Sequence, residues 1–141
     1  SASLLRTLLR FGRLPEADRR VLAGRIGIHV LDSFREALRN GPQGALDDAR
    51  NFAQPWDFTM EGISVPTVIW HGDMDNQVPV AAAEVYARLI PHAQLCIKDG
   101  EGHFSLVVQY KREIITSLFA IAERYVLTDV TSAARTFPPA G

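Results

Sequence analysis

The chain has 141 residues, of which 47% are apolar, and its 15 Lys and Arg residues nearly balance 16 Asp and Glu residues. This length fits one domain that could bury a core without disulfide or metal staples, and the net charge of −1 argues against nucleic acid or an anionic membrane surface as a partner. The longest stretch without a charged residue, 62–72, is too short to span a bilayer. With one cysteine and no export signal in this sequence, we expect a soluble, cytoplasmic chain.

The first 58 residues predict short helices and no strand. Apolar residues at helical spacing, with Gly and Pro as stops, place these helices at about 4–9, 15–22, 30–38 and 46–52. The third is the best marked, because Arg39-Asn40-Gly41 follows it as a stop signal. We interpret residues 1–58 as one helical segment.

From Ser64 the pattern changes to that of a parallel sheet. The apolar, β-branched run at 65–70 predicts a strand that is buried on both faces. The elements that follow are a helix at 82–90, a second strand at 93–97 and a helix with its apolar stripe over 114–126. This order is typical of an α/β fold with crossover helices, so residues 59–127 are predicted to form a core segment. Residues 128–141 lack an apolar period and are predicted to be a flexible tail.

Two polar loops follow the two predicted strands, at 71–79 and 100–105. Loops at the carboxyl ends of adjacent parallel strands lie side by side, so Asp75 of the first loop and His103 of the second can meet. A carboxylate that accepts the Nδ1 proton of a histidine fixes its tautomer and leaves Nε2 free to act as a general base. The sequence therefore predicts two members of a nucleophilic triad.

The same residues resemble a known family. The stretch 65–79, the segment Ile90-Pro91-His92-Ala93 and the segment Gly100-Glu101-Gly102-His103-Phe104 look like the C-terminal part of an α/β-hydrolase. In that family a strand followed by G-x-x-D-x-x-V-P carries the triad acid, and a later G-x-G-H carries the histidine. The resemblance, which spans about residues 61–125, implies that Asp75 is the triad acid and His103 the base. It also implies that residues 1–58 are the helical cap, called the lid below.

The nucleophile of that family is absent from the sequence. It sits on a G-x-S-x-G elbow that precedes the acid and the histidine, and Ser64, the nearest match, has proline where the second glycine belongs. Cys96 lies inside the second predicted strand, where a thiol would be buried and inert. We therefore expect a C-terminal fragment that is inactive alone, whose partner is the missing N-terminal core segment or a second copy of the chain. That partner is expected to pair with the strand edge at 65–70, unless the lid helices cover it.

Each candidate residue also has a simpler interpretation. Asp75 could cap a helix or organise a turn, in which case Asp73 would be the alternative acid. The spacing His71-x-Asp73-x-Asp75 also suits a metal ion. His103 could be an ordinary surface histidine, as we expect for His29 and His92.

Aromatic residues offer a possible substrate pocket, formed by Trp56, Phe58 and Phe104. Trp56 and Phe58 are first of all expected to pack the joint between lid and core. Ser105 is expected to begin the last helix.

The function that the resemblance implies is that of a serine-type hydrolase of esters or related bonds, acting on a small-molecule substrate without a metal or organic cofactor. Haloperoxidase-like or C–C hydrolase activity would use a similar triad. The alternative is a non-catalytic interaction or scaffold module on the same fold.

Overall fold

The computed structural model describes the backbone of residues 14–135 and the side chains of residues 14–125. The helix predicted at 4–9 and residues 136–141 of the predicted tail lie outside the described residues. The elements in chain order are α2 (Glu16–Leu22), α3 (Arg25–Ala37), α4 (Gln43–Phe52), the short 3-10 helix η1 (Met60–Gly62), β1 (Val68–Gly72), α5 (Val80–Leu89), β2 (Gln94–Lys98) and α6 (Ser105–Arg135).

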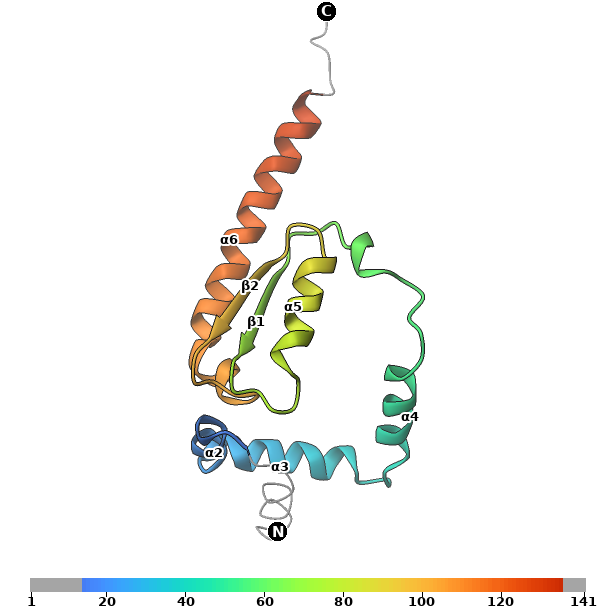
Figure 1. Cartoon of the computed structure of the whole chain (residues 1–141), viewed down its shortest axis with the longest axis vertical. Helices are drawn as coiled ribbons and strands as arrows, with labels where there is room; N and C mark the ends of the chain where they lie inside the picture. Colours follow the sequence, from blue (N-terminus) through green and yellow to red (C-terminus); the bar gives the residue numbers. More distant parts are fainter. Residues whose placement is uncertain (1–13, 136–141) are drawn as a thin grey trace, which may run out of the picture.

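The two strands pair in parallel, and the crossover helix between them is α5. Val68 lies opposite Gln94, and the register continues to Gly72 opposite Lys98. Figure 1 shows α5 on one side of the strands and α6 on the other, with α2 and α3 beyond the carboxyl ends of the strands. The predicted α/β class with parallel strands and crossover helices is confirmed.

The first strand starts later than its apolar run. β1 begins at Val68 rather than at residue 65, because Pro66 has no N–H to donate to a ladder. The expectation of full burial is wrong in part, although α5 and α6 lie on the two faces of this strand: Val68, Ile69 and Trp70 are half-buried, and His71 and Gly72 are buried. The physical reason is that the described sheet has two strands, so each has an edge without a strand partner.

Lys98 ties the second strand to the rest of the core segment. Its ammonium lies 5.0 Å from the ring centroid of Trp70 on β1 and 4.6 Å from that of Tyr110 on α6. A cation over aromatic faces is attracted by their quadrupoles. This contact joins both strands and α6 through three side chains.

The lid begins with two helices that pack closely on each other. Pro15 precedes α2, where its missing N–H costs nothing. Gly27, in the first turn of α3, is buried against α2, and a Cβ there would lie 2.8 Å from the carbonyl carbon of Leu22. Leu22 and Leu31 are the buried apolar side chains of these helices. This close approach fixes α3 against α2.

The rest of the lid is exposed. All residues from 32 to 59 are exposed, and α4 buries none of its side chains. In the part of the chain whose side chains are described, five apolar side chains are buried: Leu22, Leu31, Ala83, Ile90 and Leu106. Many of the apolar residues that the sequence offers for a core are therefore exposed or half-buried in this structure.

Helix α6 is longer than its apolar stripe. It begins at Ser105, as expected, but continues to Arg135. The prediction of a flexible tail from residue 128 is therefore wrong for residues 128–135. The sequence there lacks Gly and Pro until Pro138, and an established helix adds residues without a further nucleation cost.

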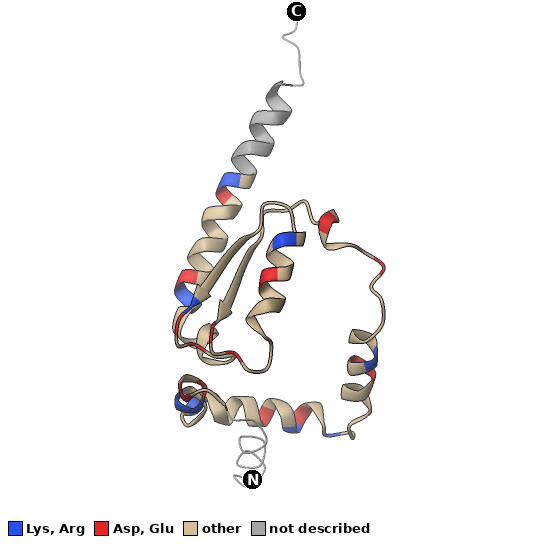
Figure 2. Ribbon diagram, in the orientation of Figure 1, with Lys and Arg blue, Asp and Glu red and all other residues tan. Residues whose placement is uncertain are grey.

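The described lid helices do not cover the edge of β1. Neither α2, α3 nor α4 lies along it (Figure 1), so the expectation of lid cover is wrong for these helices, and pairing with another segment stays a prediction. Figure 2 shows Lys and Arg interspersed with Asp and Glu along the lid helices. Among the described helices, none is long and apolar enough to cross a membrane.

Candidate active site

The loops after β1 and β2 are joined by backbone and side-chain hydrogen bonds at one edge of the sheet. Asp73 donates its N–H to the carbonyl of Lys98 at 3.1 Å, and Met74 donates to the carbonyl of Glu101 at 2.9 Å. The carboxylate of Asp73 accepts the N–H of Gly100 at 2.6 Å. These bonds hold the two loops side by side, as the parallel topology requires.

Gly72 permits this close approach. A Cβ at Gly72 would lie 2.6 Å from the carbonyl carbon of Glu101 and 3.0 Å from the carbonyl oxygen of Gly102. Real side chains do not tolerate such contacts with backbone atoms, so a residue with a side chain would push the loops apart. The glycine of the G-x-x-D motif is thus a packing requirement of the site.

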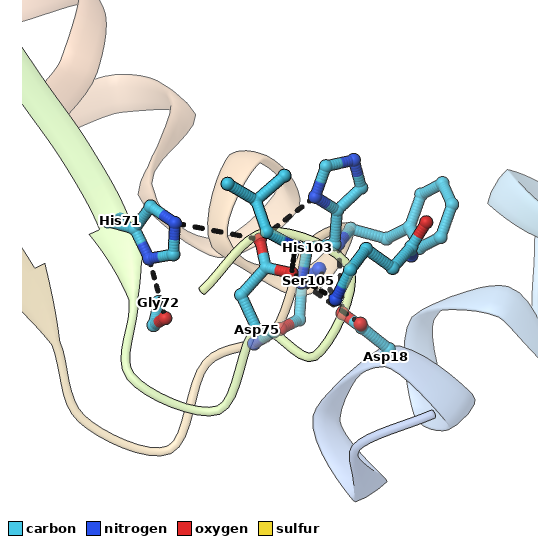
Figure 3. Close-up of polar contacts among 10 residues, drawn as sticks. Asp18, His71, Gly72, Asp75, His103 and Ser105 are labelled. Atoms are coloured by element: carbon cyan, nitrogen blue, oxygen red, sulfur yellow. Dashed lines mark hydrogen bonds and ion pairs between the residues drawn. The ribbon is translucent and has the colours of Figure 1, made fainter. Parts of the chain in front are cut away.

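Asp75 and His103 meet across the two loops (Figure 3). Oδ2 of Asp75 lies 2.9 Å from Nδ1 of His103, although the residues are 28 positions apart. Because an ionised carboxylate only accepts, Nδ1 donates to it, and in the neutral form of the ring Nε2 then keeps its lone pair. The side chain of His103 is 41% exposed and that of Asp75 only 7%. A buried carboxylate thus contacts an accessible imidazole.

The turn after Asp75 holds its other oxygen. Oδ1 accepts the backbone N–H of Gln77 at 2.8 Å and of Val78 at 2.9 Å. Burial raises the pKa of Asp75, but the hydrogen bonds from Val78, His103 and Gln77 outweigh this effect, and the pKa falls below its ordinary value of 3.8. Asp75 therefore organises its turn and also contacts His103, and the two interpretations are compatible.

His71 approaches Asp75 from the other side (Figure 3). Its Nδ1 lies 2.8 Å from the carbonyl of Gly72 and donates to it, since a carbonyl cannot donate. Its Nε2 lies 4.0 Å from Oδ2 of Asp75 and has no hydrogen-bond partner among the described residues. His71 thus packs against the acid without a direct hydrogen bond to it.

Asp18 of α2 holds the backbone that carries His103. Its side chain is fully buried. Oδ2 accepts the N–H of His103 at 3.0 Å, and Oδ1 accepts those of Phe104 at 2.9 Å and Ser105 at 2.8 Å. Ser105 is the first residue of α6, and His103 and Phe104 directly precede it, so no carbonyl of the helix can reach these N–H groups. An acid of the lid therefore caps the helix that follows the histidine.

The neighbouring amides of this loop are also satisfied. Gly102 donates its N–H to Oγ of Ser105 at 2.8 Å, and Leu106 donates to the carbonyl of Gly102 at 3.4 Å. Gly102 is buried, and a Cβ there would lie 2.5 Å from Cγ of Asp18. The second glycine of the G-x-G-H motif is thus needed for the approach of Asp18.

The structure also tests the two alternative interpretations of the first loop, Asp73 as the acid and a metal site. Asp73 is turned to Gly100, whereas Asp75 contacts His103, so the geometry favours Asp75 as the acid. The structure does not bring His71, Asp73 and Asp75 together as a metal-binding group, because His71 approaches Asp75 whereas Asp73 is turned away to Gly100. Within the described side chains, no group of three or more His, Cys, Asp or Glu residues could hold a metal ion.

Of the three aromatic residues, the structure brings Phe104 to the site. Its ring meets that of His103 edge-on, with centroids 5.3 Å apart. Trp56 and Phe58 pack on each other at 5.2 Å and are exposed, and they line an open hollow of about 500 Å³ with Pro55 and Asp57. The expectation that they pack the joint between lid and core is wrong, because that joint is made by α2 through Asp18.

Other residues considered from the sequence lie away from this contact. Ser64 is exposed in the segment before β1. Cys96 lies within β2 opposite Trp70, and it is half-buried rather than buried. His29 and His92 are exposed, as expected.

Sequence reasoning missed the role of Asp18. An acid in the first turn of a helix is ordinary, because it complements the helix dipole, and nothing local distinguishes Asp18 from Glu16. The available signal was indirect: the second glycine of Gly100-Glu101-Gly102-His103 leaves room for a group that the sequence does not name.

Comparison with known proteins identifies the fold family. A model of the alpha/beta hydrolase fold matches residues 7–110, which include part of the lid, both strands and both loops. A non-heme haloperoxidase of Rhodococcus erythropolis is 34% identical over 73 residues, which are 50% of this chain and 26% of that protein. The chain thus spans about a quarter of the length of this relative. The extent of the family match shows that the chain belongs to the α/β-hydrolase fold family.

Proposed function

We propose that this chain supplies the acid and the base of a Ser-His-Asp triad in a larger serine-type hydrolase of esters or related bonds. The observation that carries the proposal is the 2.9 Å contact between Asp75 and Nδ1 of His103 on two adjacent loops. Membership of the α/β-hydrolase fold family supports it. The nucleophile comes from sequence outside this chain, which contains no G-x-S-x-G elbow.

The proposed reaction uses the two ring nitrogens of His103 differently: Nδ1 donates to Asp75, and Nε2 accepts and returns protons. Nε2 of His103 takes the proton of the serine hydroxyl as its oxygen attacks the acyl carbon, and then gives this proton to the departing alcohol. Water next attacks the acyl-enzyme, His103 takes its proton and returns it to the serine oxygen, and the acid leaves. Asp75 stabilises the imidazolium that forms in each half. Phe104, edge-on to His103, gives the acyl group an apolar wall.

The test compares histidine variants in the full-length protein that carries this chain. His103→Ala is expected to lower kcat for a p-nitrophenyl ester by roughly three orders of magnitude or more. His92→Ala, an exposed histidine, is the matched control and should retain wild-type activity. Full activity of His103→Ala would exclude His103 as the base.

A second measurement locates the nucleophile. A fluorophosphonate probe is expected to label one serine of the full-length protein and no serine of the 141-residue chain alone. Stoichiometric labelling of a serine within the chain, such as Ser64, would show that the nucleophile has been misplaced. Loss of labelling in His103→Ala would link the labelled serine to the base.

The relative suggests a second activity to measure. Because it is a non-heme haloperoxidase, halogenation of an indicator dye with bromide and hydrogen peroxide should be assayed beside ester hydrolysis. If the same triad serves both, His103→Ala abolishes both. If halogenation survives in that variant, the second activity does not belong to this site.

A further inference from the structure

We propose that Asp18 is a positioning residue for the base: the lid, through this one carboxylate, fixes the backbone from which the imidazole of His103 reaches Asp75. This inference rests on the proposed function and deepens it. His103 is then held at two points, by Asp75 at its ring and by Asp18 at its backbone N–H. Figure 3 shows the two carboxylates on either side of the loop.

The division of labour between the two oxygens of Asp18 supports this role. Oδ1 accepts from Ser105, the first residue of α6, and from Phe104 just before it, whereas Oδ2 accepts from His103. A cap that served the helix alone would need only the first of these oxygens. The second fixes the residue that carries the imidazole.

Because Asp18 is buried, water cannot easily replace it as the hydrogen-bond acceptor of His103. The side chain of Asp18 is fully buried, and it packs so closely against Gly102 that no side chain would fit between them. An acceptor that is removed from a buried site leaves its donors unpaired, and the loop then relaxes toward water or another partner. A shift of 1 Å in a catalytic group is enough to lower a rate by about 100-fold. The position of His103 is thus sensitive to a residue that does not contact the substrate.

Asp18→Asn separates the two oxygens. Its one amide oxygen can replace Oδ1 and keep the bonds to Phe104 and Ser105, while its NH₂ group faces the N–H of His103 and loses that bond. In the full-length protein we expect kcat to fall about 10-fold or more, with KM within about twofold of wild type. Asp32→Asn, an exposed carboxylate on the lid helix α3, is the matched control and should leave both constants unchanged.

Amide hydrogen exchange gives a readout that does not depend on activity. In Asp18→Asn the amide of His103 should exchange faster than in wild type, and those of Phe104 and Ser105 should change less. Asp18→Ala should expose all three amides. If Asp18→Ala does not fold, Asp18→Asn alone decides the question.

The outcomes separate this inference from the proposed function. If His103→Ala is inactive but Asp18→Asn keeps the wild-type kcat, the triad stands and the positioning role of Asp18 is overturned. If Asp18→Asn lowers only the free energy of unfolding, its role is structural and the inference is again overturned. If His103→Ala is fully active, the proposed function fails first, and Asp18 positions no base.

Discussion

The loops after β1 and β2 are held by side-chain hydrogen bonds to partners far along the chain, including Asp18 of α2, in addition to local ones. In the described lid beyond α2, the ion pairs lie within about one turn of the same helix. Asp73, Asp75 and Asp18 contact groups 27 to 87 positions away. The lid pairs Asp32 with Arg35 and Asp47 with Arg50, each at i,i+3 and exposed. Long-range bonds specify a tertiary arrangement, and local exposed pairs only support a helix that already exists.

The comparison shows that the presence of a carboxylate in the sequence does not by itself predict its structural role. The same residue type is a joint between segments at Asp18 and a surface partner at Asp47, depending on burial and on the sequence distance of its partners. The contrast can be tested by making the same substitution in both regions.

The largest expected contrast comes from glycine. Gly72→Ala should lower the free energy of unfolding by about 3 kcal/mol or more, because its Cβ would strike the backbone of Glu101. Gly44→Ala on α4 has nothing within 4 Å of the added Cβ and should be neutral or stabilising by about 0.5 kcal/mol. Urea unfolding of both variants measures the difference. Equal effects would remove the distinction between the two regions.

Acid should weaken the contacts of Asp75 in a defined direction. Its pKa in the folded chain is below the ordinary 3.8, so the stability from its ionised form is present above that value and is lost as pH falls through the lowered folded pKa. Asp75→Asn should therefore be less stable by about 1–2 kcal/mol at pH 7, with the difference vanishing in strong acid. Urea unfolding across this range, with Asp99→Asn as an exposed control, measures it. A difference that does not vary with pH would contradict this account.

The smallest contrast compares two exposed carboxylates. Asp73→Asn weakens the bond to Gly100 that joins the two loops and should cost about 1 kcal/mol. Asp47→Asn weakens a pair on α4 and should change stability by less than about 0.5 kcal/mol. Thermal unfolding of both variants measures the difference between their losses of stability. A larger loss for Asp47→Asn would show that the lid depends on its local pairs.

The site could be predicted as far as its signals are local. Asp75 and His103 follow strands that apolar runs reveal, and parallel topology brings such loops together, so their contact was predictable from the chain. Asp18 was not, because its partners lie 85 to 87 positions away and no pattern near it reports them. For the same reason the sequence predicts the joint between lid and core at Trp56 and Phe58, which lie near the boundary in sequence but not in the structure.

The fold shows a similar limit. The apolar periods place α2 to α5, the start of α6 and both strands approximately, but they miss η1, the first turn of α3 and the end of α6. That end depends on helix propagation through a polar segment, to which hydrophobic spacing is blind. The sequence overestimates the burial of β1. Its apolar run indicates a strand suited to a buried position, but in the described sheet it has one neighbouring strand, so its other edge stays open.

Asp18 also relates the site to the order of folding. The bond to His103 closes a loop of 85 residues, and a closure of that length costs more chain entropy than the local contacts within α2, α5 or the parallel pair. It also needs a donor that is synthesised long after the lid. The contact that fixes the position of His103 can therefore form only after the chain has been made past Ser105.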